Sequence, residues 1–557
     1  MKILLINPVT RESDLPKYFP LGLGLIAALL KRNGHEVEVF DDNVERLDDE
    51  RAAARLAAAH ADAFGLTGLI TDFSTVQRLA AAVREAHPHA PIVLGGGLAS
   101  SFGEYVLAHT AIDYVLPGEG DVALFPLLDA LAAGRIPAGL PGVGYRREGR
   151  VVAPPPGGMV TDLDALPPTD YDAFAVDTYA ENMKQAWMFS QPTRALSIIT
   201  SRGCPYHCIY CDKAIFGNRF RQRSAPNAVA EIERIVTRYG LQGVLFADDT
   251  FTLDRRFLTE FCRLLCERLP GVRWAGNGRI GRLDEPLIAE MAAAGCDTLG
   301  FGIESGSQII LDEMRKGVRV DQALETLRLL EKHGIRPLGY ITVGSFAESE
   351  ETINETIAFL DETKLKAGVN FLTPFPGSPL YDEAVRRGKL HQRPEEFLDR
   401  WGAWQQTLLV NLTEMSDEEL IAHKHRVEMH TGGRGKTAAA MAFTLPAAEQ
   451  RRLWANALRR IGERGYRRVI LFGAGQHTER FLQWRRTQDT LPVAAVFDQN
   501  PAKAALSAHW GVPVIDRLPD DLHGTAILLS SDSFEEEMLA QLRALLPDVD
   551  NVFRLYG

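Results

Sequence analysis

The chain has 557 residues, of which 46% are hydrophobic and 24% are charged, and its formal net charge is −12. This length suggests about three domains, and the composition is typical of a protein with large cores. The acidic balance gives no general attraction to nucleic acid or to an anionic membrane, so neither partner is expected. No window approaches ~18 uninterrupted apolar residues, which predicts no transmembrane segment.

The opening residues and the cysteine content indicate a compartment. MKILLINP predicts a strand followed by a proline rather than a signal peptide. Six cysteines are too few for a disulfide scaffold, and they favour a reducing cytoplasm.

The first block, residues 1–145, alternates short apolar runs with helical stretches. Its five strand candidates are KILLIN, HEVEVF, DAFGLT, APIVLGG and IDYVLP. Alternation of this kind predicts an α/β fold with a parallel, doubly wound sheet. The proline-rich stretches APPPGG and ALPPTDYD then predict a linker over 146–190.

Three further blocks follow the predicted linker. Residues 191–400 contain six strand–helix units and predict a partial (β/α)6 barrel of the TIM type, with its site at the carboxyl ends of the strands. Residues 401–445 predict a helical connector. Residues 446–557 predict a small Rossmann-like α/β domain.

A loop rich in thiols follows the first predicted barrel strand. It contains Cys204, Cys208 and Cys211 within SRGCPYHCIYCDKAIFG. Structural zinc requires four ligands, and His207 is the nearby candidate for a fourth. A disulfide would leave one cysteine unpaired. A 4Fe–4S cluster held by three thiolates accounts for the count, because its fourth iron stays open to bind and activate another molecule.

The C-x3-C-x2-C spacing, with Tyr210 directly before the last cysteine, resembles the radical S-adenosylmethionine (radical SAM) superfamily. The resemblance implies that Cys204, Cys208 and Cys211 hold the cluster and that the open iron chelates S-adenosylmethionine. It also implies an external electron donor such as flavodoxin or ferredoxin, and cleavage of the sulfonium to a 5′-deoxyadenosyl radical.

Further stretches of the predicted barrel are similar to this family. Glu304 in FGIESGS, Asp248 and Asp249 in FADDTFT, and Arg279 in GNGRIGRLD each end a predicted strand. The resemblance implies that Tyr210, Asp249, Arg279 and Glu304 contact S-adenosylmethionine. The alternatives are a helix N-cap for the aspartates and an ordinary ion pair for Arg279. VGSFAES departs from the glycine–proline–glycine–glutamate turn that relatives carry at this place.

The first block resembles the cobalamin-binding domain that is fused to many radical SAM enzymes. The resemblance lies in the stretch PLGLGLIAALLKRNGHEVEVFDD and in the glycines that follow successive strands. Glycines leave room for a large cofactor at the sheet edge; alternatively, they only form tight turns. The predicted cobalamin-binding residues are Thr67, Gly68, Gly95, Gly96, Gly118 and Glu119.

No Asp-x-His-x-x-Gly motif is present, and His35 and His60 are poorly placed to bind cobalt. We therefore expect cobalamin to bind without an imidazole from the protein.

The remaining cysteines and the last block carry weaker signals. Cys262, Cys266 and Cys296 are expected to pack in cores as small apolar residues. Gly473 and Gly475 follow a predicted strand, but no third glycine completes a dinucleotide fingerprint. The role of the last domain stays open between packing, partner binding and ligand binding.

Together these features predict a cobalamin-dependent radical SAM enzyme that methylates an unactivated carbon of a small molecule, natural product or lipid. Two alternatives are a cobalamin-dependent oxidative cyclase or rearrangement enzyme that transfers no methyl group, and a non-catalytic cobalamin and iron–sulfur redox sensor. No acid, base or nucleophile pair is recognisable in the sequence, as expected where cofactors supply the chemistry.

Overall fold

The structure is a computed structural model of the chain. It describes residues 1–10, 15–390, 398, 408–432, 447–473, 478, 481–482, 485, 491–498, 507, 511–519, 522–529, 542–543 and 551–554. The chain divides into two compact units, Met1–Arg434 and Gly435–Gly557.

The first unit begins with a seven-stranded sheet in the order β2-β1-β3-β4-β5-β6-β7. The first five strands are parallel, as predicted. The strands are β1 (Lys2–Asn7), β2 (Glu36–Asp41), β3 (Ala63–Thr67), β4 (Ile92–Gly95), β5 (Tyr114–Val115), β6 (Gly144–Arg147) and β7 (Arg150–Val152). The helices are α1 (Leu21–Arg32), α2 (Asp42–Glu45), α3 (Asp49–Ala57), α4 (Phe73–Ala86), α5 (Gly97–His109) and α6 (Gly120–Ala132).

Both faces of this sheet are covered, because side chains of a strand alternate between faces. In β1, Ile3 and Leu5 pack in a core with residues of α1 and α6. Leu4 and Ile6 pack in a second core with residues of α3, α4 and α5. The predicted doubly wound sheet is therefore confirmed.

The sheet continues past the start of the predicted linker. β6 and β7 add to its edge as an antiparallel hairpin. Glu148 and Gly149 form the hairpin turn with φ of 52° and 76°, the positive values that a two-residue type I′ turn requires. The prediction placed the end of regular structure too early because it relied on the prolines that follow β7.

The predicted linker also contains a helix and a buried aromatic contact. The helix is α7 (Val176–Met183). Tyr171 is 1% exposed, its ring centroid lies 4.6 Å from that of Phe19, and its hydroxyl donates to the backbone oxygen of Ser197 at 2.9 Å. This segment therefore packs against both the first sheet and the barrel.

The barrel is a six-stranded parallel sheet in the order β15-β14-β13-β12-β11-β8, and the predicted partial barrel is confirmed. Its strands are β8 (Ala195–Ile198), β11 (Gly243–Phe246), β12 (Arg273–Gly278), β13 (Cys296–Glu304), β14 (Arg336–Val343) and β15 (Ala367–Phe371). The helices between them are α8 (Ala225–Tyr239), α9 (Arg255–Arg268), α10 (Glu285–Ala293), α11 (Gln308–Glu313), α12 (Val320–Lys332) and α13 (Glu350–Thr363).

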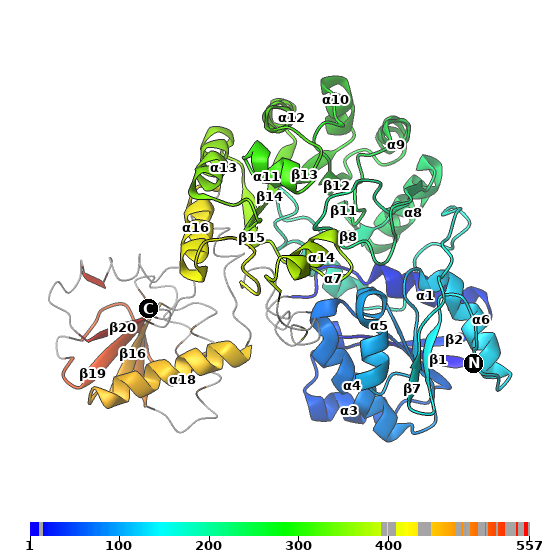
Figure 1. Ribbon diagram of the computed structural model, residues 1–557, viewed down its shortest axis with the longest axis horizontal. Coiled ribbons are helices and arrows are strands. Elements are labelled where there is room, and N and C mark those ends of the chain that lie inside the picture. The colour runs from blue at the N-terminus through cyan, green and yellow to red at the C-terminus, as the bar shows by residue number, and fades with distance from the viewer. Residues whose placement is uncertain are drawn as a thin grey trace. The chain divides into compact units, whose positions relative to one another are not determined.

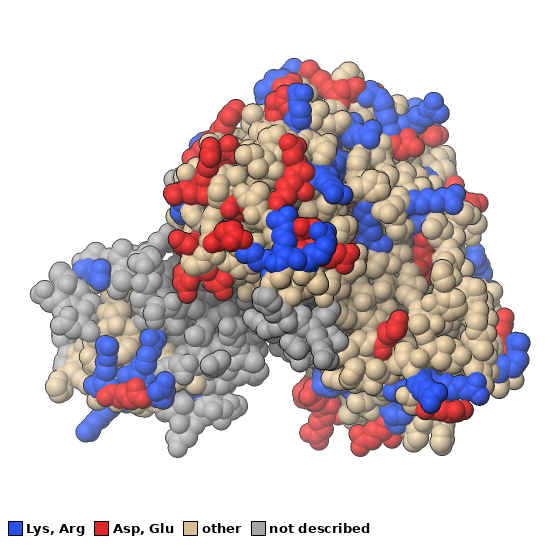
Figure 2. All heavy atoms as spheres, in the orientation of Figure 1, with Lys and Arg blue, Asp and Glu red and all other residues tan. Residues whose placement is uncertain are grey.

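Figure 1 shows α8, α9, α10, α12 and α13 in an arc outside the barrel strands. After the last strand come α14 (Pro379–Arg386) and α16 (Asp417–Met429), the latter within the predicted helical connector. On the face shown in Figure 2, basic and acidic side chains are interspersed over the outer helices, without one continuous basic surface.

The second unit contains a parallel sheet in the order β18-β17-β16-β19-β20, as expected for the small Rossmann-like α/β domain predicted there. Its described elements are α18 (Ala447–Glu463), β16 (Arg468–Phe472), β17 (Val493–Phe497), β18 (Val514–Ile515), β19 (Thr525–Leu529) and β20 (Val552–Arg554). Gly473 follows β16 with φ of 102°, and Gly475 lies outside the described residues.

Among the described helices, none has the length and apolar content needed to cross a bilayer.

Candidate cofactor site

The cysteine loop starts at the carboxyl end of β8 and is closed at its base by two short strands. β9 (Ser201–Arg202) pairs antiparallel with β10 (Arg221–Gln222). Gly203 has φ of +83°, and a Cβ there would lie 2.3 Å from the backbone oxygen of Arg219. Only glycine fits this close approach. We refer to residues 203–220 as the cluster loop.

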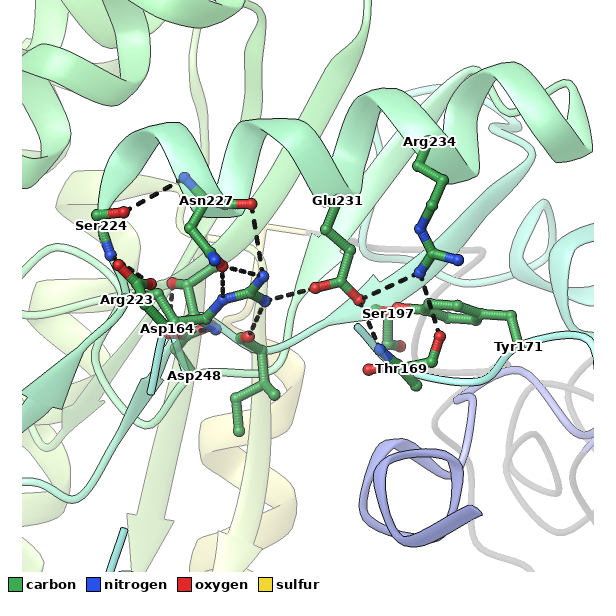
Figure 3. A network of polar contacts seen from close by, with 12 residues as sticks. Asp164, Thr169, Tyr171, Ser197, Arg223, Ser224, Asn227, Glu231, Arg234 and Asp248 are labelled. Atoms are coloured by element: carbon green, nitrogen blue, oxygen red, sulfur yellow. Dashed lines mark hydrogen bonds and ion pairs between the residues drawn. The ribbon is translucent and has the colours of Figure 1, made fainter. Parts of the chain in front are cut away.

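Side chains of α8 and its flanking residues, together with Asp248, brace the segment that leads from β8 into the cluster loop (Figure 3). The Arg223 guanidinium pairs with Glu231 at 2.6 Å and donates to the backbone oxygen of Ile199 at 3.2 Å. Asp248, at the end of β11, accepts from the hydroxyls of Thr200 at 2.8 Å and Ser201 at 2.5 Å. The loop therefore leaves a strand end whose backbone is held from two sides.

The backbone of the cluster loop is also fixed beside its thiols. The Cys204 amide donates to the oxygen of Gly217 at 3.3 Å, and the Cys211 amide donates to the oxygen of Cys208 at 3.4 Å. Between the last two cysteines, the Ile209 amide donates to the Met314 oxygen at 3.1 Å. The short spacing therefore places the thiols on one well-supported loop.

The thiols themselves are free and largely shielded from solvent. Cys208 is 9% exposed, and Cys204 and Cys211 are half-buried. The Cys204 sulfur lies 3.8 Å from the Thr250 hydroxyl, and the Arg279 Nη1 lies 3.9 Å from the Cys208 sulfur. Burial raises the pKa of the Cys211 thiol to about 12, and the neighbouring Cys204 raises it further.

This donor set fits a 4Fe–4S cluster better than a single ion. In the described residues, no three His, Cys, Asp or Glu side chains converge as the ligands of one metal ion would. Thiolates of a cluster each bind their own iron and therefore stand farther apart. Bound iron deprotonates its thiol ligands outright, which offsets the desolvation that raises the pKa of Cys211. His207, the alternative zinc ligand, is exposed.

A buried triad joins the cluster loop to β13. The Tyr210 hydroxyl donates to Glu304 Oε1 at 2.8 Å, and Lys316 Nζ lies 2.7 Å from the same oxygen and 2.8 Å from the Tyr210 hydroxyl. Burial raises the pKa of Tyr210 well above its ordinary value, and the Glu304 carboxylate adds to this effect. The structure thus brings Tyr210 and Glu304 together and adds Lys316, which sequence reasoning missed.

The backbone at Glu304 is strained. Its φ is 66°, a left-handed conformation that is uncommon for a residue other than glycine and is typical of functional sites. The register of β13 against β14 shifts at this point. At Gly302, a Cβ would lie 2.3 Å from Glu304 Oε1 and 2.7 Å from Lys316 Nζ, so glycine is needed for the triad to form.

Arg279 and Tyr206 lie on another side of the cluster loop. The Arg279 guanidinium carbon lies 3.5 Å from the centroid of the Tyr206 ring, and Arg279 Nη2 donates to the backbone oxygen of Lys316. Arg279 therefore stacks on the loop and reaches the turn that supplies Lys316. This stacking is not the simple ion pair considered as the alternative for this arginine.

The two aspartates at the end of β11 differ. Asp248 is 1% exposed; burial raises the pKa of its carboxyl to about 6, although hydrogen bonds from Ser201 and Thr200 oppose this shift. Through these bonds Asp248 holds the segment that directly follows β8. Asp249 is exposed. Partial desolvation raises the pKa of Asp249 above its ordinary value, and the positive charge of Lys213 offsets only part of this shift.

The carboxyl edge of the first sheet is lined by glycines. Gly96 has φ of +84°, and a Cβ there would lie 2.9 Å from the Thr67 hydroxyl and 3.0 Å from the Gly68 oxygen. At Gly95 a Cβ would meet no atom within 4 Å. Leu69, directly after Gly68, is 49% exposed. Open space beside an exposed apolar side chain fits a large, partly apolar macrocycle such as a corrin.

The histidines of this sheet lie at its opposite edge. Each histidine between residues 1 and 145 lies shortly before the start of a strand. Because parallel strands all begin at the amino edge of a sheet, these histidines lie on that side. These residues are His35, His60, His87, His89 and His109. None of them lies at the carboxyl edge, and binding of cobalamin without a protein imidazole stays a prediction.

Gly118 and Glu119 follow β5 at the carboxyl edge. Gly118 has φ of +78°, and its amide donates to the Ser100 hydroxyl at 2.9 Å. The Glu119 side chain is 2% exposed and pairs with Arg202 at 2.6 Å and with Arg221. Both oxygens of Glu119 are thus occupied by arginines of the hairpin that closes the cluster loop. Its contact with cobalamin stays a prediction.

The other three cysteines do not form a second site. Cys262 is 3% and Cys296 is 6% exposed, as expected for core residues. Burial raises the pKa of Cys262 to about 12. Cys266 is exposed instead, and its thiol donates to the Ala293 oxygen at 3.6 Å. The helical spacing of Cys262 and Cys266 did not place both in the core.

Two family models match the two parts that form these edges. Residues 198–360 match the Radical SAM superfamily, and residues 10–127 match the B12 binding domain. The matched ranges contain the cluster loop and the glycine-lined edge, respectively.

Several known proteins are similar to about two thirds of this chain or more. An uncharacterized methyltransferase of Pyrococcus horikoshii is 28% identical over 398 residues, 70% of this chain and 84% of that protein. An anaerobic magnesium-protoporphyrin IX monomethyl ester cyclase of Rubrivivax gelatinosus is 27% identical over 396 residues, 69% of this chain and 70% of that protein. The structure of TsrM, a radical S-adenosylmethionine methyltransferase of Kitasatospora setae, superposes with a TM-score of 0.60 at 22% identity. This superposition covers 69% of this chain and 76% of TsrM, and it shows a shared fold.

Proposed function

The chain belongs to the cobalamin-dependent radical SAM enzymes, and we propose that it transfers a methyl group to an unactivated carbon of a small-molecule substrate. The observation that carries this proposal is the position of three free thiols on one braced loop at the carboxyl end of β8. When bound, the 4Fe–4S cluster with S-adenosylmethionine supplies a 5′-deoxyadenosyl radical, and cobalamin supplies the methyl group.

Cys204, Cys208 and Cys211 would hold the cluster. Three thiolates leave one iron open for the amino and carboxylate groups of S-adenosylmethionine. Cys208 is shielded from solvent and the other two thiols are half-buried, so the loop limits access of water to the iron. The protein itself therefore contributes by positioning the cluster and S-adenosylmethionine and by excluding water.

Polar side chains around the loop would orient S-adenosylmethionine, which carries a cationic amino group and sulfonium as well as a carboxylate. Asp249 is exposed at the end of β11 and offers an acceptor for ribose or amino groups. Arg279 offers donors to the carboxylate from beside Cys208. Glu304, fixed by Tyr210 and Lys316, would present its remaining oxygen at the same place.

Thr67, Gly68, Gly95, Gly96 and Gly118 would form the cradle for cobalamin at the carboxyl edge of the first sheet, the edge at which doubly wound sheets bind ligands. Their small size leaves the backbone accessible to the corrin and its side chains. Glu119 contributes through the arginines that it binds, as developed below.

An oxidative cyclisation or rearrangement without methyl transfer is the second candidate. It is favoured by the likeness to the cyclase of Rubrivivax gelatinosus, which covers nearly as much of this chain as the likeness to the methyltransferase. Both outcomes use the same cofactors and the same cluster loop. For either reaction we expect a one-electron donor such as flavodoxin or ferredoxin, and free thiols suit the reducing cytoplasm.

The test is anaerobic incubation of the reconstituted chain with reductant, cobalamin and S-adenosylmethionine carrying a deuterated methyl group, with a small-molecule extract as the substrate pool. A methyltransferase forms 5′-deoxyadenosine and S-adenosylhomocysteine, and the label appears on a carbon of a product. A cyclase forms 5′-deoxyadenosine without transfer of the label. A chain that forms neither nucleoside product contradicts both enzyme functions and leaves the redox sensor.

A further inference from the structure

Glu119 is the centre of a buried ionic cluster at the base of the cluster loop. Its side chain is 2% exposed, and those of Arg202 and Arg221 are 6% and 4% exposed. Arg202 Nη1 lies 2.6 Å from Glu119 Oε2 and also pairs with Asp121, while Arg221 Nη1 pairs with Glu119 Oε1. Each carboxylate oxygen of Glu119 therefore has its own guanidinium.

The partners come from two different parts of the chain. Glu119 lies directly before α6 in the first sheet's domain, whereas Arg202 and Arg221 face each other in the β9–β10 hairpin of the barrel. The residues paired in this way are 83 and 102 positions apart in the sequence. The cluster of charges thus joins the corrin-binding domain to the base of the cluster loop.

The same two arginines also hold the far side of the loop. The Arg202 guanidinium carbon lies 5.3 Å from the centroid of the Phe216 ring, within the range of a cation–π contact. Arg221 Nη2 donates to the Phe216 backbone oxygen at 3.2 Å. A movement of Glu119 would therefore also move the cluster loop, because both arginines contact Phe216 in that loop.

One hydrogen bond and one close approach of the backbone also link the loop to the same domain. The Ser101 hydroxyl of α5 donates to Asp212, next to Cys211, at 3.3 Å. A Cβ at Gly118 would lie 3.8 Å from the Ile215 oxygen. These contacts are weak beside the ionic cluster, because neither of them pairs opposite charges.

A buried ionic cluster is not the most stable way to join two surfaces. Removing these charges from water carries a desolvation penalty, and packed apolar side chains of similar volume are often equally or more stable. Charge-assisted hydrogen bonds instead fix distance and direction. The feature that the cluster adds is a defined position of the loop relative to the sheet.

We propose that Glu119 is a positioning residue that, through Arg202 and Arg221, holds the cluster loop at one distance and orientation from the glycine-lined edge. This inference rests on the proposed function, because it requires an iron–sulfur cluster in the loop and cobalamin at the edge. Transfer between two cofactors bound to separate domains depends on such a fixed geometry.

The chain offers a matched control in Glu231. Its side chain is also 2% exposed, and it pairs with Arg223 at 2.6 Å and with Arg234 at 3.9 Å. Figure 3 shows that these partners tie α8 to the segment around Thr169 and to the end of β8. Glu231 therefore matches Glu119 in burial and chemistry, but its described bonds reach neither residues 1–145 nor the cluster loop directly.

The experiment measures the separation of the two cofactors by pulsed electron paramagnetic resonance. The full chain is reconstituted with iron and sulfide, loaded with cob(II)alamin and partly reduced, so that the cluster and cobalt are both paramagnetic. The variants are Glu119→Gln and Glu231→Gln. Glu119→Gln is expected to fold, because the two arginines keep other partners. Arg202 still pairs with Asp121, and Arg221 still donates to the backbone oxygens of Val160 and Phe216.

The wild-type chain should give one narrow distribution of distances, and Glu119→Gln should give a broadened and shifted one. Glu231→Gln should match the wild type even if it unfolds at a lower temperature. Glu119→Asp, which keeps the charge but shortens the side chain, should shift the distance with little broadening. This variant replaces Glu119→Gln in the measurement if the glutamine variant does not fold.

An unchanged distribution in the Glu119 variants, or equal broadening in Glu231→Gln, would overturn the inference while leaving the proposed function intact. A wild-type chain that takes up no cluster or no cobalamin would overturn the proposed function and this inference with it.

Discussion

The mouth of the barrel and the carboxyl edge of the first sheet differ in polarity and in the space that they leave open. At the mouth, charged and polar side chains form closed networks, such as Tyr210 with Glu304 and Lys316. At the sheet edge, glycines leave open space, and the exposed side chain is the apolar Leu69. Both surfaces lie at the carboxyl ends of parallel strands, so strand direction alone does not explain the difference.

The contrast matches the size and charge of the two groups. A compact cluster with a zwitterionic ligand needs thiolates and paired charges close to the iron, whereas a wide macrocycle needs room and access to the backbone. A substitution at one surface should therefore impair the binding of the cofactor held there and leave the binding of the other cofactor unchanged. The predictions below test this independence.

The largest effect is expected from the cluster loop. Replacing Cys204, Cys208 and Cys211 together by alanine should abolish the absorbance of the reconstituted cluster and reduce 5′-deoxyadenosine to background, because no thiolate remains to bind iron. Cobalamin binding should persist. The matched control replaces the other three cysteines, Cys262, Cys266 and Cys296, and should keep the cluster. Loss of the cluster in both triple variants would contradict the assignment.

The reverse experiment damages the sheet edge. Gly96→Ala places a methyl group about 3 Å from the Thr67 hydroxyl and the Gly68 oxygen at a positive φ, and overpacking of this kind costs about 1–3 kcal/mol. Cobalamin should bind roughly 10- to 100-fold more weakly in equilibrium titrations, with the cluster unaffected.

Gly149→Ala is the control for the sheet edge. Gly149 also has a positive φ, 76°, but a Cβ there meets no atom within 4 Å. Both substitutions strain the backbone, and only Gly96→Ala fills the cradle. Equal cobalamin affinities in the two variants would show that the glycines at the edge merely form turns.

A third substitution tests the closed network at the barrel mouth. Glu304→Gln leaves Lys316 buried without its carboxylate, which should lower the free energy of unfolding by about 3 kcal/mol. Glu325→Gln removes an exposed pair with Arg328, and it should leave stability nearly unchanged because solvent screens such pairs. Denaturant titration of both variants measures the difference. Equal stability of the two variants would mean that Glu304 is not held as described.

The smallest effect concerns the pH dependence of stability. The buried Asp248 has its pKa raised from 3.8 to about 6, so the folded chain binds this proton more tightly than the unfolded chain does. Its contribution to stability is therefore present below about pH 4 and is lost as the pH rises through about 6. Between pH 5 and pH 7, wild type should lose on the order of 1 kcal/mol relative to Asp248→Asn. Parallel stability curves for the two proteins would contradict this.

Much of the architecture could be predicted because it depends on local patterns. Apolar runs of strand length identified the parallel strands of the first sheet and all six barrel strands. The cysteine spacing identified the cluster loop because its residues are adjacent in the chain. The hairpin of β6 and β7 was missed, since its turn lies before the prolines on which the linker prediction relied.

The contacts between distant segments could not be predicted in this way. Arg202 and Arg221 flank the cluster loop in the sequence, but nothing local indicates that Glu119 lies between them. Lys316 follows Glu304 by twelve positions and reaches it only because a turn after α11 folds back. A single sequence therefore gave the residue types of the site more readily than the partners that fix them.

The central claim is that three thiolates hold a cluster with one iron open to S-adenosylmethionine. The most direct measurement is the electron paramagnetic resonance spectrum of the anaerobically reconstituted, dithionite-reduced chain before and after addition of S-adenosylmethionine. The account predicts a 4Fe–4S signal that changes on addition, because the ligand binds the open iron. A signal that S-adenosylmethionine leaves unchanged, or that survives replacement of all three cysteines, would contradict it.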